Sequence, residues 1–580
     1  MRVPFLAAVS NHRSSYGAAA CLLASLLPLA CSAGDESGEA KLSGELAIYE
    51  SSFKDGASSL HYGLRRPGLP EVTVELAEPV AYAPGASVEL AGRFDEKGHF
   101  VASSVVRATG EPGLGTSTQA LAQPTQTRNV AILLLRPSDQ ATPAPWVVGK
   151  ELVANNLFGT ASLPDFPAKP QNTDAYYREA SYGARALSGN VFDWLTIDPL
   201  VDYCDTNALR TAGLAKAAES GIDLSAYQHV GFVVAAGCGN IAGRAELGTP
   251  SNPGRYSWYY YEGGSELFIH ELGHNFGLQH ALVYSCSSGG EAVTIAPVAQ
   301  CTENPDFPQD VWDPMGIRSF AHFGGYNKML QGWLAGSNVV TAGPAGGDFT
   351  LEPLELASSA PQLLRVPADS SLCPADINPC FYYVEYRQPI GFDGTPQFTN
   401  TSMHDGALLR LGGDIDTTGN SLGALTRLPS VHPPIQADTL RVGETFQDPT
   451  GLRITTVATP SAGGHQNLVI RVSRASRISA TVALSSGQSG ATGSYCADVK
   501  ITNISTTAVN GGWLVRLNLN QSTLSSGWNG TFTSAGGSLY DVTAAAWNAT
   551  ILPGQFTTAS FCANKTGASF TPQVAFTTSN

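Results

Sequence analysis

Continuous apolar runs alternate with polar and glycine-rich segments in the middle of the chain. Residues 129–135 and residues 230–236 are apolar over the length of a buried strand. Residues 207–219, which lie between these runs, carry a pattern that predicts a helix. Strands that alternate with helices indicate an α/β sheet. We therefore expect an α/β domain over residues 129–340.

Short β-favouring runs, separated by glycine and proline, occupy the regions on both sides of this domain. Residues 46–107 contain the runs Val-Thr-Val-Glu-Leu at 72–76 and Ser-Val-Glu-Leu at 87–90, which predict a small β-domain. Residues 341–475 carry short alternating runs that predict a second β-rich domain. Residues 478–580 combine low charge with regular short strands, which is typical of a β-sandwich. The expected fold class is a multidomain α+β chain, with its α/β domain flanked by β-rich domains.

The first 31 residues have the pattern of an export signal. Arg2 and Arg13 give a basic segment, and residues 18–30 form an apolar stretch of about 13 residues. That length is too short to span a bilayer comfortably, and we expect no transmembrane segment. Cys31 follows the stretch, which leaves open lipidation of Cys31, as in bacterial lipoproteins, and ordinary signal cleavage. Both outcomes predict a secreted protein, and the first would anchor it to a bacterial cell surface.

Two polar segments separate the predicted domains at the N-terminal side. Residues 32–45 are small and polar and predict a flexible tether. Residues 108–128 are rich in Gly, Ser, Thr, Gln and Pro, and predict a linker where the chain is cut during maturation. The small β-domain between them is either an inhibitory propeptide or an accessory module. No cysteine occurs at positions 32–203, so this domain has no thiolate with which to block a metal.

Composition and charge exclude some classes of partner. The chain has 580 residues, enough for several domains with their own cores. Its net charge of −15 argues against nucleic acid or an anionic membrane surface as a partner.

The cysteines indicate an oxidising compartment. Of the 10 cysteines, Cys21 lies in the predicted signal and Cys31 is the candidate lipid site, which leaves an even number. An even number in an exported protein predicts disulfides. None of them has the C-x-x-C spacing of a cysteine zinc site or a redox motif. Sequential pairing is the simplest arrangement, because it keeps each bridge within one predicted domain. The predicted pairs are Cys204–Cys238, Cys286–Cys301, Cys373–Cys380 and Cys496–Cys562.

The sequence His-Glu-Leu-Gly-His-Asn-Phe-Gly-Leu-Gln-His at 270–280 carries the candidate chemistry. On a helix, His270 and His274 share one face and can bind one ion, while Glu271 reaches water beside it without being a ligand. Gly277 can take a positive φ and end the helix, which returns His280 as a third ligand. Three protein nitrogens leave a fourth position open, as in a catalytic zinc site.

A second motif follows the histidines. Residues 313–316 read Asp-Pro-Met-Gly, and Met315 is one of four methionines. Together the two motifs resemble the metzincin metalloproteases, in which a methionine turn lies beneath the three-histidine site. The residues at 271–281, the Asp-Pro-Met-Gly turn and Phe-Tyr-Tyr-Val-Glu-Tyr-Arg at 381–387 resemble the gametolysin-like (M11) peptidases, over residues 128–475. The resemblance is strong only at the zinc motif.

This resemblance implies a site and a fold. Zinc would be bound by His270, His274 and His280, Glu271 would act as the general base and acid, and Met315 would pack beneath the histidines without binding the metal. The implied fold is a metzincin-like α/β catalytic domain at 129–340. The sequence leaves open whether calcium also binds.

The predicted C-terminal sandwich resembles the family 2 carbohydrate-binding modules, which bind cellulose, chitin or xylan. The matching residues are Val-Lys-Ile-Thr-Asn at 499–503, Gly-Trp at 512–513, Gly-Trp-Asn at 527–529, Trp-Asn at 547–548 and Leu-Pro-Gly at 552–554. By position Trp513 belongs to the core, and Trp528 and Trp547 are the exposed residues that stack on sugar rings. The chain departs from the family near Thr492, where a further surface tryptophan is expected.

The sequence therefore predicts a secreted zinc-dependent endopeptidase that acts on protein or glycoprotein substrates at a polysaccharide surface. Two alternatives stay open. The protein is an adhesin or scaffold on polysaccharide with a silent metal site, or its zinc serves another hydrolysis, such as amide cleavage in a cell-wall peptide. Proteolysis that a chelator abolishes distinguishes the first prediction from the adhesin.

Overall fold

The computed structural model of the protein describes most of the chain beyond the predicted signal. The signal, Cys31 and most of the linker predicted at 108–128 lie outside the described residues. The described residues are 39–54, 58–77, 80, 82, 84–107, 126–143, 147–159, 172–261, 263–303, 310–316, 319–344, 346–373, 379–395, 402–414, 426–427, 439–474, 476–485, 493–505, 508–510 and 512–579.

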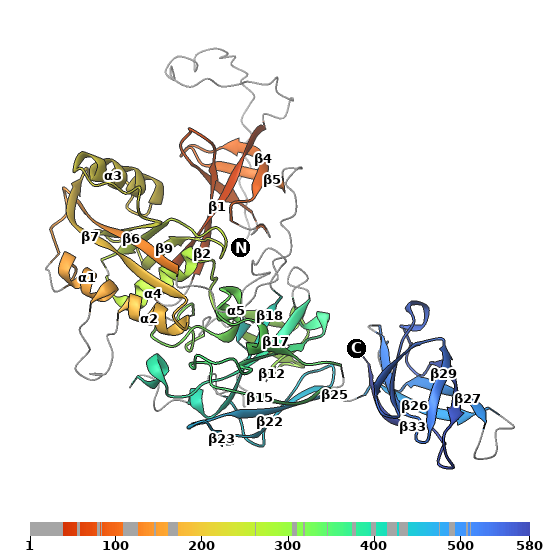
Figure 1. The fold of residues 1–580 in the computed structure, drawn as a ribbon. Coiled ribbons are helices and arrows are strands. Elements are labelled where there is room, and N and C mark those ends of the chain that lie inside the picture. Colours follow the sequence, from red (N-terminus) through yellow and green to blue (C-terminus); the bar gives the residue numbers. More distant parts are fainter. Residues whose placement is uncertain are drawn as a thin grey trace, which may run out of the picture.

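Strands dominate this part of the chain (Figure 1). Among the described residues there are 33 strands and only five α-helices, the longest of which has 14 residues. None of these helices has the length and apolar character that crossing a membrane requires.

The N-terminal half forms one ten-stranded sheet in the order β2-β3-β5-β4-β1-β9-β10-β8-β6-β7. Five strands come from the N-terminal segment: β1 (Ala40–Phe53), β2 (Ser58–Arg65), β3 (Val72–Leu76), β4 (Ser87–Phe94) and β5 (Phe100–Arg107). Five follow it: β6 (Gln126–Pro137), β7 (Arg185–Ile197), β8 (His229–Val234), β9 (Ile241–Glu246) and β10 (Tyr256–Tyr260). Among the described residues, the only strand pairing that joins the two groups is the antiparallel pair of β1 and β9.

Helices cover both faces of the second group of strands. Alternate residues of a strand point to opposite faces, and in β6 Ile132 and Leu134 pack with one core cluster while Leu133 and Leu135 pack with another. The first cluster includes side chains of α1 (Lys150–Phe158), α2 (Thr173–Ala180) and α4 (Ser265–Asn275). The second includes side chains of α3 (Thr206–Glu219). The continuous apolar run of β6 is therefore the mark of a strand buried on both faces.

A second assembly of strands begins inside the region predicted as α/β. Its sheet runs β12-β11-β19-β18-β17-β16-β14, with β13 and β20 at its sides, and α5 (Gly325–Leu330) contacts β17. The strands are β11 (Leu282–Ser288), β12 (Glu291–Val293), β13 (Cys301–Glu303), β14 (Val339–Thr341), β16 (Leu363–Pro367), β17 (Cys380–Tyr386), β18 (Gly406–Gly413), β19 (Thr426–Arg427) and β20 (Leu440–Arg441).

A smaller four-stranded sheet in the order β15-β25-β22-β21 shares the core of this assembly. It is formed by β15 (Gly347–Leu351), β21 (Thr445–Gln447), β22 (Leu452–Ala458) and β25 (Leu468–Arg474), and a hairpin of β23 (Ser461–Ala462) and β24 (His465–Gln466) joins the last two.

The C-terminal segment is a β-sandwich, as its sequence predicts. One sheet runs β26-β27-β32-β29 and the other β30-β31-β28-β33, with a single core cluster formed by both. The strands are β26 (Ile478–Leu484), β27 (Ser494–Asn503), β28 (Trp513–Asn518), β29 (Ser522–Trp528), β30 (Thr531–Gly536), β31 (Leu539–Thr543), β32 (Phe556–Lys565) and β33 (Gln573–Ser579). In Figure 1 the sandwich stands beside the rest of the molecule.

All four predicted disulfides are present. They join Cys204 to Cys238, Cys286 to Cys301, Cys373 to Cys380 and Cys496 to Cys562. The last one crosses between the paired strands β27 and β32 of the sandwich.

The expected fold class is wrong. The chain is mostly β, and no α/β metzincin-like domain stands by itself at 129–340. The sheet of that region takes half its strands from residues 40–107, and the chain from 282 onward joins a different sheet. The physical reason is that strand pairing satisfies backbone groups between distant segments, which local runs of apolar residues do not reveal.

Candidate metal centre and polysaccharide-binding face

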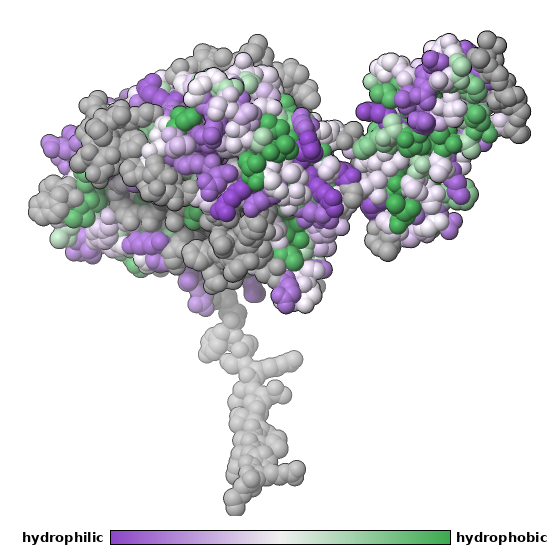
Figure 2. Space-filling view, turned by 90° about the horizontal axis from the view of Figure 1, so that it is seen from below, coloured by the Kyte–Doolittle hydropathy of each residue, from purple (hydrophilic) through white to green (hydrophobic). Residues whose placement is uncertain are grey.

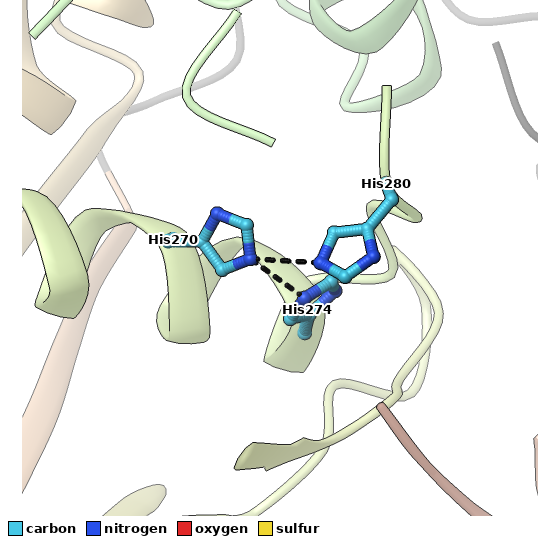
Figure 3. A group of neighbouring side chains, drawn as sticks. All are labelled: His270, His274 and His280. Carbon is cyan, nitrogen blue, oxygen red and sulfur yellow. Dashed lines mark hydrogen bonds between the residues drawn. The ribbon is translucent and has the colours of Figure 1, made fainter. Parts of the chain in front are cut away.

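Helix α4 and the turn after it bring the three motif histidines together (Figure 3). His270 and His274 lie one turn apart on α4. Gly277 follows the helix with φ of 93°, and a Cβ at this position would lie 2.7 Å from the Cα of Thr249. Only glycine fits that backbone and that close approach, and the reversal returns His280 to the helix.

The side chains converge on one point. The Nε2 atom of His270 lies 3.0 Å from Nε2 of His280 and 3.1 Å from Nε2 of His274. The dashed lines of Figure 3 mark these two approaches. Three nitrogens this close can bind one metal ion together, and the described residues that could do so include all three predicted ligands.

The outer ring nitrogens face acceptors. Nδ1 of His270 lies 2.5 Å from the carbonyl oxygen of Pro314, and Nδ1 of His274 lies 2.8 Å from that of Leu278. A carbonyl oxygen only accepts, so each Nδ1 carries the proton and each Nε2 presents a lone pair. Nδ1 of His280 lies 2.9 Å from a carboxylate oxygen of Glu50. Such outer contacts orient metal-binding histidines.

Burial keeps the imidazoles of His274 and His280 neutral. Desolvation is the largest cause that lowers the pKa of His274 and of His280, to about 3 in each case. For His274 the carboxylate of Glu50 opposes this shift, and the neighbouring histidines add to it. The neutral ring is the form that binds a metal. These two histidines can therefore bind a metal ion at neutral pH without first losing a proton.

Glu271 is fully buried between α4 and β9. Its carboxylate occupies the space left by Gly243 of β9, where a Cβ would lie 2.2 Å from Oε1 of Glu271. Desolvation lowers the pKa of Arg244, and the negative charge of Glu271 is among the causes that oppose this shift. The absence of a side chain at Gly243 therefore leaves room for the carboxylate of Glu271, the predicted general base.

The Asp-Pro-Met-Gly turn lies against the same helix. A Cβ on Gly273 would lie 2.3 Å from Sδ of Met315, which is fully buried. The carboxylate of Asp313 accepts hydrogen bonds from the backbone N–H of Met315 at 2.8 Å and of Gly324 at 2.7 Å. The carbonyl of Met315 accepts one from the N–H of Ala281 at 3.0 Å. These bonds fix the turn relative to the residue after His280, and the packing of Met315 at Gly273 places it against α4.

A buried ionic network that the sequence did not predict supports the turn. Arg410 of β18 lies 2.9 Å from Asp310 and 2.5 Å from Glu385. Glu385 belongs to the motif at 381–387 and also lies 2.9 Å from Arg387. The backbone N–H of Asp310 in turn donates to the carbonyl of Ala281 at 2.8 Å. The motif thus supports the histidine cluster through packing and charge, from a strand more than 100 residues away.

Glu50 is a further residue beside the histidines that the sequence did not predict. It lies on β1, in the segment predicted as a separate β-domain, and is buried. Its second carboxylate oxygen lies 3.3 Å from Nδ1 of His274. No local signal marks it, because only the pairing of β1 with β9 brings it to the histidines.

The C-terminal sandwich places its three tryptophans in two environments. Trp513 is buried, and its ring N–H donates to the carbonyl of Asn548 at 2.9 Å. Trp528 is 45% exposed and Trp547 is 70% exposed. Figure 2 shows hydrophobic residues at the surface of this domain among polar ones. Large apolar side chains that this surface exposes are Ile504, Trp528, Trp547, Leu552 and Phe556.

Comparison with known proteins identifies one part of the chain. The family described as cellulose binding domain matches residues 480–579. A chitin-binding domain from Streptomyces coelicolor is 22% identical and aligns over 17% of this chain and 92% of its own length, with a TM-score of 0.14. The cellulose-binding family 2 domain of ScLPMO10C is 24% identical over 18% of this chain and 100% of its own, with a TM-score of 0.16. TM-scores this low support no conclusion.

None of the curated proteins matches the chain. The family match, in contrast, covers nearly the whole sandwich, from β26 to β33. Residues 480–579 are therefore a cellulose-binding domain of family 2, through which the protein binds polysaccharide.

Proposed function

We propose that the protein is an exported zinc-dependent endopeptidase that its C-terminal domain holds at a polysaccharide surface. The observation that carries the proposal is the convergence of three Nε2 atoms, on His270, His274 and His280, whose outer nitrogens all face acceptors. Three imidazoles suit zinc among the common metals and leave one position for the reaction. A zinc ion there would supply Lewis-acid activation of water and of a carbonyl group.

The chain's own residues would do the rest. Pro314 and Leu278 hold the rings of His270 and His274 in the orientation that presents Nε2. Glu271 would accept a proton from the attacking water at a carboxylate oxygen and deliver it to the nitrogen of the leaving amine.

The motifs support a peptide bond as the substrate. The sequences at 270–280 and 313–316 resemble those of metzincin peptidases, and this resemblance rests on the motifs alone. The cellulose-binding domain would place the enzyme beside proteins or glycoproteins that are attached to polysaccharide. Export, by the signal or with a lipid on Cys31, belongs to the same proposal.

The test is hydrolysis of casein by the purified protein, as isolated and after limited trypsin digestion, with and without 1,10-phenanthroline. Glu271→Gln keeps the histidines and should lose most of the turnover, on the order of 10²-fold or more. Glu266→Gln, in the first turn of the same helix, is the matched control and should keep its activity. Equal hydrolysis by Glu271→Gln would refute the proposal.

A further inference from the structure

The strand β1 occupies the edge of β9 beside the histidine cluster. Residues 49–52 of β1 pair antiparallel with residues 243–246 of β9, so that Glu50 lies opposite Ala245 and Ser52 opposite Gly243. Gly243 is the position whose missing side chain makes room for Glu271. The N-terminal segment therefore runs directly along the place where the predicted general base meets β9.

This arrangement closes the site. Both carboxylate oxygens of Glu50 face outer nitrogens of the cluster, one toward His280 and one toward His274. The three histidines and Glu271 are each at most 2% exposed. A peptidase has to admit a polypeptide to its metal, and an extended peptide commonly binds by adding a strand to a free sheet edge. With β1 in place, β9 has no free edge.

The contact between strands β1–β5 and strands β6–β10 combines apolar and polar groups. Ala47 and Tyr49 of β1 pack in the core cluster of α3 and β8, where the ring of Tyr49 meets that of Trp258 edge-on. Arg65 pairs with Glu246 of β9, and the guanidinium Nε of Arg244 donates to Ser51 of β1 at 2.6 Å. Arg210 of α3 lies 3.2 Å from Glu71. Polar contacts of this kind beside apolar ones are typical of interfaces between domains of one chain.

Each group of strands also keeps its own sheet if β1 separates from β9. The N-terminal strands pair among themselves around their own core cluster, while β9 remains paired with β10 on its other side. Separation would break one strand pair, remove Ala47 and Tyr49 from the core cluster of α3 and β8, and leave two complete sheets.

We propose that β1 is an internal blocking strand, which closes the metal centre through its pairing with β9 and through Glu50, and whose displacement admits the substrate. This inference rests on the proposed function, and it implies that the protein with β1 in place is an inactive form of the peptidase. The occupant of the β9 edge in the closed protein is the chain's own N-terminal segment.

The experiment measures closure apart from catalysis. The full chain, freed of metal by chelator, is treated with diethylpyrocarbonate, and the modification of each histidine is followed by mass spectrometry. We compare the intact protein, the trypsin product that has lost residues 39–107, and the variant Glu50→Ala. Glu45→Gln is the control, because Glu45 lies on the same strand but is exposed and does not pair with β9.

In the intact protein and in Glu45→Gln, His270, His274 and His280 should react at least tenfold more slowly than in the trypsin product. Glu50→Ala should react at an intermediate rate. His322 is buried away from β1 and should stay protected throughout, which shows that the fold is intact. Equal reactivity of the cluster in the intact chain and the trypsin product would overturn the proposal.

Casein hydrolysis by portions of these proteins that are not treated with diethylpyrocarbonate, and are reloaded with zinc, separates the two claims. Hydrolysis that rises at least tenfold after loss of residues 39–107 supports both of them. Equal hydrolysis by the intact protein refutes the blocking strand and leaves the peptidase. No hydrolysis by any sample refutes the peptidase, while the histidine reactivity still decides whether β1 closes the site.

Discussion

Replacement of Gly273 by alanine tests whether Met315 packs directly beneath the histidine cluster. In the interior of a helix, Gly→Ala ordinarily stabilises a protein by about 1 kcal/mol. Here the new Cβ would lie 2.3 Å from Sδ and 3.2 Å from Cε of Met315. Ordinary contact distances are roughly 3.5–4.0 Å, so the sulfur would have to move by about 1 Å or more. Met315 is fully buried and has little room to do so.

The expected effect is a net loss of stability. Overpacking of a filled core costs about 1–3 kcal/mol, which exceeds the gain in helix propensity of about 1 kcal/mol. Gly273→Ala should therefore lower the free energy of unfolding by about 1 kcal/mol. For a domain of roughly 150–250 residues, that corresponds to a fall in Tm of about 2–4 °C.

A double-mutant cycle isolates the contact. Met315→Ala alone should cost about 2–5 kcal/mol, because it opens a cavity beneath α4. In the double variant the methyl group introduced at position 273 enters that cavity, so the two changes together should cost less than their sum by about 1 kcal/mol or more. Differential scanning calorimetry measures all four proteins. A higher Tm for Gly273→Ala, or strict additivity in the cycle, would refute the packing argument.

Three other predictions concern catalysis, acid stability and binding. Gly243→Ala should displace the carboxylate of Glu271, since the added Cβ would lie 2.2 Å from Oε1, and a casein assay should show a loss of turnover at unchanged zinc content. Burial lowers the pKa of His229 to about 3. As the pH falls below 6.5, this histidine is protonated in the unfolded chain but not in the folded one, so the free energy of unfolding decreases until the pH reaches the folded-state pKa. Between pH 6.5 and pH 4.5 this lowers the free energy of unfolding by about 2 kcal/mol. Calorimetry should therefore find that Tm falls less with decreasing pH in His229→Phe than in the wild type. An equal fall of Tm in both proteins would contradict the role given to His229. Trp528→Ala and Trp547→Ala should each weaken adsorption to cellulose by about 1–2 kcal/mol, or roughly 5–30-fold, and adsorption isotherms unchanged in both variants would exclude these rings from the binding face.

The sequence predicted the features that depend on local spacing. His270 and His274 are one helical turn apart and Gly277 has the positive φ that the motif requires, so the cluster follows from residues within one short segment. The sandwich and the sequential disulfides were predicted for the same reason, because each is contained within a short stretch of chain or a single domain.

The sequence did not predict the features that depend on distant pairing. The α/β fold class was wrong because β1 adds to β9 and extends the sheet with strands from residues 40–107. Glu50 reaches His280 through that same pairing, across 230 positions of sequence. Arg410 and Asp310 likewise meet beneath the turn only because β18 packs there. Apolar runs show that a strand is buried, but they do not determine which other strand pairs with it.

The metal content of the protein tests the central claim most directly. The metal-free protein should take up one zinc ion per chain, counted by native mass spectrometry in the presence of a competing chelator. His270→Ala, His274→Ala and His280→Ala should each lose this uptake, while His465→Ala, which changes a histidine of the distant β23–β24 hairpin, should retain it. Zinc that fails to bind the wild-type protein, or that binds the three cluster variants as well as it binds His465→Ala, would contradict the account.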